Sequence, residues 1–112
     1  MRPTIFEQII AGKIPSTKVF ENETILAIED IHPVAPVHIL IMPKKHIPDL
    51  QSLGADDLLL IGEIVQVAQE LAKRLGILEG YRLLTNSGPM AGQTIFHLHF
   101  HLIGGRPLDI LG

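Results

Sequence analysis

Cysteine is missing from the sequence, since none occurs among its 112 residues. Without thiols the chain forms neither disulfides nor cysteine-bound zinc sites, so a metal would need histidine or carboxylate ligands. Aromatic residues make up only 4% of the chain. This leaves little material for the base-stacking surfaces of proteins that bind single-stranded nucleic acid.

An excess of either charge is also absent. The formal net charge is −3, and the 9 basic and 12 acidic side chains are scattered along the chain. Proteins that bind polymeric nucleic acid concentrate basic residues on one surface, and the sequence shows no such concentration. The charge pattern therefore favours a small molecule as the partner.

Long hydrophobic runs are missing as well. No stretch approaches the roughly 18 consecutive apolar residues of a membrane-spanning helix, and the opening Met-Arg-Pro-Thr lacks the apolar segment of a secretory signal. We therefore expect a cytoplasmic protein that makes no use of a membrane. A hydrophobic content of 46% suits one compact domain spanning 1–112.

Two helices and five strands are predicted from the local patterns. Thr4 as N-cap and Glu7 three residues later form a capping box, which predicts a short helix over 4–11. Apolar residues recur at helical spacing over 56–75, and Gly76 follows where a C-terminal cap belongs. The predicted strands are Lys18–Glu21, Ile25–Glu29, His38–Met42, Tyr81–Asn86 and Ile95–Ile103.

This order of elements predicts an α+β fold. It consists of a single five-stranded antiparallel sheet with one long helix and one short N-terminal helix. The segment 31–36 contains two prolines and is predicted to be a fixed loop. Because one helix leaves an edge strand uncovered, we expect a homodimer in which the sheet extends across the two copies.

The most informative feature is the run of three alternating histidines. His97, His99 and His101 are separated by Leu98 and Phe100. On a strand, the three imidazoles share one face while the apolar residues between them pack under the helix. Histidine is rare enough that three within five residues indicate a functional site.

The residues alone leave two chemistries open for this site. Alternate strand residues lie about 7 Å apart, so the outer histidines are separated by roughly 13 Å and one zinc ion does not reach all three. Two of them could join His38 or His46 in a three-histidine zinc site. In the alternative, His99 is a nucleophile toward phosphorus, because a neutral imidazole is nucleophilic near pH 7.

The loop before the histidines offers groups for an anion. Gly88 and Gly92 permit close backbone approach, and Thr94 carries a hydroxyl. By itself, a connection rich in Gly and Pro is more typical of a hairpin turn. Only its position next to the histidines favours a phosphate-binding role.

At this point the sequence resembles the histidine-triad family, and in particular its nucleotide-binding phosphoramidase branch. Besides the triad, the matching stretches are Thr4-Ile5-Phe6, Asp30-Ile31, Ala35–His38, Pro43–His46, Gly92-Gln93-Thr94 and Gly104-Gly105-Arg106. The resemblance implies hydrolysis of the phosphorus–nitrogen bond of purine nucleoside 5′-phosphoramidates through a nucleotidyl-histidine. It implies a purine nucleotide, AMP or GMP, as the bound group and no external cofactor or metal.

The resemblance also assigns roles to single residues. His99 would be the nucleophile, His101 a phosphate contact, and His97 a support for the site through His46. The phosphate would be lined by Asn86, Gly92 and Thr94, the ribose hydroxyls would bind Asp30, and the base would lie in an apolar slot of Ile5, Phe6 and Ile31. Without the family pattern, such apolar residues are more typical of an ordinary core, and a structural role is favoured for His38.

Three departures from the branch limit what the resemblance implies. Thr94 stands where serine is usual, and its extra methyl group could crowd the leaving group. The tail after Arg106 lacks the tryptophan and proline of many relatives, which leaves the leaving-group specificity open. The two cysteines of a structural zinc site in some bacterial relatives are absent. A nucleotide-binding module with incidental turnover, a zinc hydrolase and a dinucleoside polyphosphate hydrolase stay as alternatives.

Overall fold

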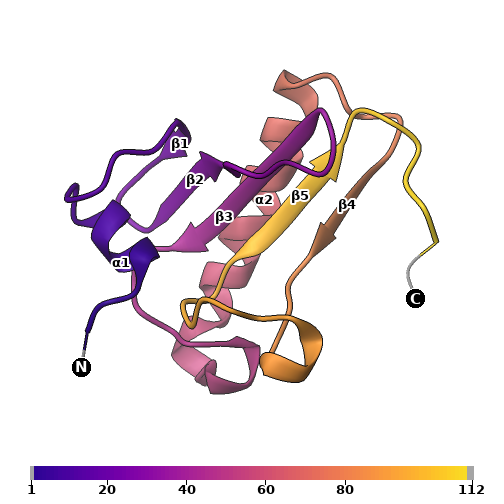
Figure 1. The fold of residues 1–112 in the computed structure, drawn as a ribbon. Helices are drawn as coiled ribbons and strands as arrows, with labels where there is room; N and C mark the ends of the chain where they lie inside the picture. The colour runs from indigo at the N-terminus through magenta and orange to yellow at the C-terminus, as the bar shows by residue number, and fades with distance from the viewer. Residues whose placement is uncertain (1, 111–112) are drawn as a thin grey trace.

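The computed structural model describes residues 2–110, and these form one five-stranded sheet flanked by helices (Figure 1). All strand pairs are antiparallel, in the order β1-β2-β3-β5-β4. The strands are β1 Lys18–Glu21, β2 Ile25–Glu29, β3 Val37–Pro43, β4 Tyr81–Leu84 and β5 Phe100–Gly104, and the helices are α1 Ile5–Ile10 and α2 Leu58–Arg74. The predicted fold class is confirmed. Within residues 2–110, no helix is long and apolar enough to span a membrane.

Helix α1 begins with the predicted capping box. The backbone N–H of Glu7 donates to Thr4 Oγ1 (3.1 Å), and the N–H of Thr4 donates to Glu7 Oε1 (2.8 Å). Two of the N–H groups that lack partners in a first helical turn are thereby satisfied. This start fixes the direction in which α1 presents its side chains.

Helix α2 is slightly shorter than the predicted 56–75, because a 3-10 turn over Ala55–Asp57 precedes it. At its other end, Gly76 has the predicted left-handed backbone, with φ +74°. The N–H of Ile77 donates to the carbonyl of Ala72 (2.9 Å), the bond of a Schellman motif. This motif stops the helix and turns the chain toward β4.

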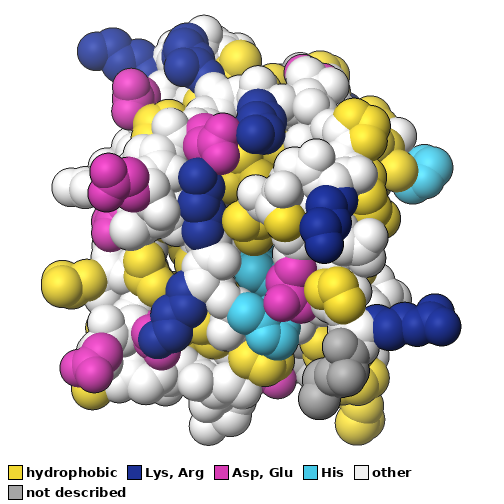
Figure 2. Space-filling view, turned by 90° about the vertical axis from the view of Figure 1, so that its left-hand side faces the viewer, with side chains coloured by type: hydrophobic (Ala, Val, Ile, Leu, Met, Phe, Trp, Pro, Cys, Tyr) yellow, Lys and Arg dark blue, Asp and Glu magenta, His cyan; other side chains and the backbone are white. Residues whose placement is uncertain are grey.

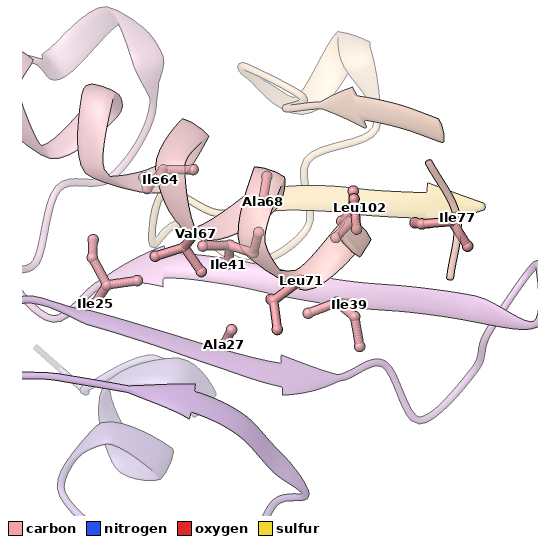
Figure 3. Packing of buried hydrophobic residues seen from close by; sticks show 11 residues of the cluster. Ile25, Ala27, Ile39, Ile41, Ile64, Val67, Ala68, Leu71, Ile77 and Leu102 are labelled. Carbon is pink, nitrogen blue, oxygen red and sulfur yellow. The ribbon is translucent and has the colours of Figure 1, made fainter. Parts of the chain in front are cut away.

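The two faces of the sheet carry different clusters of buried side chains. Facing α2 are Ile25, Ala27, Ile39, Ile41 and Leu102, which pack against Ile64, Val67, Ala68, Leu71, Ala72 and Ile77 (Figure 3). The opposite face carries Leu26, Ile28, Leu40 and Met42, which pack against Phe6 and Ile9 of α1. Since α1 has only six residues, it covers only part of that face.

The last two predicted strands are wrong at the ends that meet the histidine segment. Strand β4 stops at Leu84 rather than Asn86, and β5 begins at Phe100 rather than Ile95. Residues 95–99 are bent because their polar groups bond outside the sheet. The Leu98 N–H donates to the Ile47 carbonyl (2.6 Å), and the Thr85 hydroxyl donates to the His99 carbonyl (2.7 Å). Of the three histidines, only His101 therefore lies in a regular strand.

Candidate active site

The site lies on the sheet face opposite α2, where β3 and β5 are paired. His101 is registered with Leu40, and His38 precedes Leu40 by two positions, so both imidazoles project from the same face. Leu102 and Phe100 point the other way and pack in the cluster that faces α2, as the alternation predicts, whereas Leu98 is buried outside that cluster. On the side of the molecule where α1 and β1 lie, histidine side chains reach the surface together between acidic and hydrophobic side chains (Figure 2).

The protonation pattern of His99 is fixed by a backbone carbonyl. Its Nδ1 lies 2.7 Å from the carbonyl oxygen of His97. Because a carbonyl only accepts, Nδ1 carries the hydrogen and Nε2 keeps its lone pair when the ring is neutral. Burial lowers the pKa of His99 below its ordinary value of 6.5, so the ring is neutral at pH 7. His99 therefore presents a nucleophilic nitrogen.

His101 has the opposite pattern, and His38 is the reason. The Val34 N–H donates to His38 Nδ1 (3.1 Å), so the hydrogen of neutral His38 lies on Nε2. That Nε2 is 2.9 Å from His101 Nδ1, which must accept. The hydrogen of neutral His101 then lies on its own Nε2. His101 therefore presents a donor where His99 presents a lone pair.

The two rings are close and uncharged at neutral pH. Their centroids lie 5.2 Å apart. Burial, together with the neighbouring His99 and His38, lowers the pKa of His101 to about 4. The pKa of His38 is also lowered, mainly by burial, while the Asp30 carboxylate acts in the opposite direction. At neutral pH the site thus holds a neutral donor and a neutral acceptor side by side.

Asp30, His38 and His101 form the cluster whose spacing best suits a metal ion, since one ligand atom of each lies within 4.8 Å of the others. Zinc needs a lone pair from each imidazole. At His38, Val34 already occupies the lone pair of Nδ1, which leaves the hydrogen on the Nε2 that faces the cluster. As arranged, these residues fit a chain of hydrogen bonds and do not fit a zinc site.

His97 lies apart from this chain, in the protein interior. Its side chain has an exposed fraction of 0%, and its Nε2–H donates to the Pro43 carbonyl (2.7 Å). His46 lies beside it, with ring centroids 5.4 Å apart, and donates from Nε2 to the Phe96 carbonyl (3.0 Å). Each imidazole thus ties the histidine segment to the backbone between Pro43 and His46.

The predicted base slot combines buried and exposed apolar residues. Phe6 is buried in the cluster on the sheet face opposite α2. Its ring meets the ring of His99 edge-on, with 4.8 Å between the ring centroids. Ile5 is partly exposed, whereas Ile31 is 84% exposed at the start of the proline loop. Asp30 lies next to Ile31, with Oδ1 accepting the His32 N–H (2.8 Å) and Oδ2 3.3 Å from His38 Nε2.

The loop before the histidines is held by Gln93, a residue to which the sequence reasoning gave no role of its own. Its buried amide accepts from the Gly88 N–H (2.8 Å) and donates to the carbonyls of Pro48 (2.8 Å) and Ile95 (3.1 Å). Gly88 and Gly92 have φ +91° and +88°, values that favour glycine. The signal available in the sequence was a polar residue inside the Gly92-Gln93-Thr94 stretch.

The remaining predicted residues of this loop lie at the surface end of the site. Thr94 and Gly92 are exposed, and Asn86 is half-buried just after β4. All three are accessible to solvent, because neither cluster of buried side chains includes them. The structure therefore brings the rings of His99 and His101 together, while His97 is buried and His46 is exposed.

The sequence and the fold both have known relatives. A profile of the HIT domain matches residues 11–108. A HIT-like protein of Chlamydia pneumoniae is 53% identical over 96% of this chain and 98% of its own length. A HIT family hydrolase from Legionella pneumophila superposes with a TM-score of 0.93 at 44% identity, covering 96% of both chains. A histidine triad nucleotide-binding protein from Candida albicans gives a TM-score of 0.81 at 35% identity, covering 98% of this chain and 87% of its own. The chain with the paired His99 and His101 rings therefore belongs to the HIT, or histidine-triad, family.

Proposed function

We propose that the protein hydrolyses purine nucleoside 5′-phosphoramidates through a nucleotidyl intermediate on His99. One observation carries this proposal: the His97 carbonyl fixes the hydrogen of His99 on Nδ1, so that Nε2 offers a lone pair. A neutral imidazole held in this way is an activated nucleophile. The names of two relatives, a hydrolase and a nucleotide-binding protein, agree with the reaction class.

In the first step, His99 Nε2 forms a bond to phosphorus as the phosphorus–nitrogen bond breaks. The electron pair of that bond stays on nitrogen, which takes up one proton and leaves as an amine. His101, whose ring centroid lies 5.2 Å from that of His99, would donate from Nε2–H to the phosphoryl group or to the leaving nitrogen. The bound phosphate anion favours proton uptake at His101 Nδ1, because a negative charge raises the pKa of an imidazole, and the His38 Nε2–H would then bond to Asp30 Oδ2, 3.3 Å away.

In the second step, water attacks the nucleotidyl-His99 bond and loses one proton. Phosphorus gains an oxygen, and the bonding pair returns to Nε2 of His99. The proton consumed in the first step is thus released in the second, and the free site is restored. The His97 carbonyl accepts from Nδ1 throughout, which stabilises the positive charge that develops on the substituted ring.

The nucleotide would lie between the histidines and the two flanking loops. We assign the phosphate to Gly92, Thr94 and Asn86, because the loop that holds them is accessible and has glycines with left-handed backbone. The base would contact Ile5 and Ile31, the partly and highly exposed members of the slot. Asp30 has carboxylate lone pairs left for ribose hydroxyls after its bonds to His32 and His38.

The decisive test is where a covalent nucleotide appears. The protein would be mixed with an adenosine 5′-phosphoramidate, quenched within the first turnover and analysed by peptide mass spectrometry. We expect one nucleotidyl group on the peptide containing His99, and the same mass must be absent from the His99→Ala variant. AMP binding without amine release would instead support a nucleotide-binding module, and chelator-sensitive turnover with stoichiometric zinc would support a metal hydrolase.

We also propose that the protein is a homodimer that pairs through β4. Within residues 2–110, the outer edge of β4 has no strand partner. The other edge strand, β1, is interrupted by a bulge between Lys18 and Phe20, and the Arg74 side chain bonds to the Val19 carbonyl there. Bulges discourage edge pairing. Light scattering should give twice the mass of 12.3 kDa, and a mass of one chain would contradict the dimer.

A further inference from the structure

The proline loop beside the site is anchored by the turn that follows β5. The Arg106 guanidinium donates through Nη2 to the Val34 carbonyl (2.8 Å) and through Nη1 to the Pro107 carbonyl (2.8 Å). Gly105, with φ +95°, packs so closely that a Cβ there would lie 3.0 Å from Pro36 Cβ. Two contacts from one turn thus hold the loop over residues 33–36.

Val34 connects this anchor to the imidazoles. Its carbonyl accepts from Arg106, while its N–H donates to His38 Nδ1. His38 then faces His101 through Nε2 at 2.9 Å. If Val34 moved away, Nδ1 of His38 could carry a hydrogen or turn toward solvent. The ring would then lose its contact at Nδ1 and keep only those at Nε2, to Asp30 and His101.

We propose that Arg106 is a positioning residue for the reaction: by holding Val34, it keeps the His38 ring, and through it His101, in the orientation that presents Nε2–H to the substrate. Arg106 itself is exposed, and its hydrogen bonds go to the carbonyls of Val34 and Pro107 and not to His99 or His101. Its effect therefore reaches the site only along the hydrogen bonds through Val34 and His38. The catalytic part of this inference rests on the proposed function, whereas the hydrogen-bonded link does not.

The link is tested without substrate by amide hydrogen exchange of the folded protein. We expect the Val34 amide to be protected in the wild type and to exchange roughly tenfold faster in Arg106→Met, because its hydrogen bond opens more often. Arg106→Lys keeps a donor and should restore part of the protection. The matched control is Arg82→Met, which removes an arginine that donates to the Asp109 carbonyl. Unchanged exchange at Val34 in Arg106→Met would overturn the link.

The consequence for catalysis is tested by a double-mutant cycle between Arg106 and His38. Arg106→Met should lower kcat about three- to tenfold, the amount that one net hydrogen bond allows, with little change in KM. In a His38→Gln background the same substitution should have no further effect, because the connection is already broken. An equal loss in both backgrounds, a loss in KM alone or no loss would each overturn the proposal. If the wild type cleaves no phosphoramidate, the proposed function fails while the exchange experiment still decides the link.

Discussion

The same strands build two faces of the sheet that have different roles. The face under α2 is apolar from β2 to β5, and its buried residues come from regular elements. The opposite face is apolar only beneath the short α1, and it ends in imidazoles where β3 meets β5. Strand alternation therefore separates stability from chemistry, because each strand contributes one set of residues to each face.

The polar face also depends on irregular backbone in a way that the apolar face does not. His97, His99 and His46 donate to the carbonyls of Pro43, His97 and Phe96 respectively. Carbonyls in a regular strand are mostly occupied by the neighbouring strand. The bent segment before β5 leaves the carbonyls of Phe96 and His97 free to accept from side chains, and the Pro43 carbonyl at the end of β3 accepts from His97. These bonds set which ring nitrogens carry hydrogen.

The largest expected effect is on the polar face, at His99. His99→Ala should lower turnover by about three orders of magnitude or more, since removing a nucleophile leaves only binding and charge stabilisation. The melting temperature should change little, because the ring is only half-buried and makes one hydrogen bond to a carbonyl. Steady-state kinetics and thermal unfolding measure the two quantities. His32→Ala, in the exposed proline loop, is the control, and substantial turnover by folded His99→Ala would refute the assignment.

On the apolar face we expect the opposite result, a loss of stability with little change in turnover. The residue to change is Leu102, which neighbours His101 in the sequence but points toward α2. This side chain is fully buried in the α2 cluster, so Leu102→Ala should lower the free energy of unfolding by about 3 kcal/mol. Urea unfolding measures this loss. Turnover per folded molecule should stay within a few-fold of the wild type. A large loss of turnover in fully folded Leu102→Ala would show that the two faces are not separable.

The sequence was sufficient for the parts of the fold that local patterns determine. The capping box at Thr4, the glycine after α2 and the alternation of buried residues each lead to the observed element, because propensity and burial agree there. The bend over 95–99 was not predictable in this way. Its pattern is that of a strand, but the carbonyl of Ile47 and the hydroxyl of Thr85, both far away in sequence, compete for its backbone groups.

The same limit applies to the site. Three alternating histidines were enough to indicate a site, but they left zinc binding and nucleophilic attack both open, and only the family resemblance favoured His99 as the nucleophile. The hydrogen positions were not accessible, because they depend on the register between β3 and β5 and on the bond from Val34 to His38. The anchoring role of Gln93 was missed for a similar reason, since its partner Pro48 lies far from it in sequence.

A smaller effect on the stability of the fold is expected when the pH is lowered, and it arises from the imidazoles of the polar face. Burial lowers the pKa of His97 below 6.5, so the unfolded chain binds this proton at a higher pH than the folded one. Stability is therefore complete above pH 6.5 and is lost as the pH falls toward the folded pKa, by about 1 kcal/mol per pH unit for one histidine. His38, His99 and His101 act in the same direction.

Urea unfolding between pH 6.5 and 5 isolates this effect. The carboxylates with lowered pKa, Glu7, Glu21 and Asp57, contribute only at lower pH, since their ordinary values are 4.5, 4.5 and 3.8. His97→Asn should reduce the slope of stability against pH by about one proton. A slope that is flat in the wild type would mean that the imidazoles bind protons as readily in the folded protein as in the unfolded chain.

The smallest effect is expected at Gln93, where the polar face is supported without any group that reacts. Gln93→Leu fills the space but leaves the Gly88 N–H and two carbonyls without their partner, which should destabilise the fold by about 1–2 kcal/mol. Turnover should fall about tenfold, because the loop that binds phosphate is no longer held at its base. Gln69→Leu, on the exposed side of α2, is the matched control. If Gln93→Leu loses stability but keeps full turnover, the loop is positioned by its glycines alone, and the polar face needs less support from side chains than its hydrogen bonds indicate.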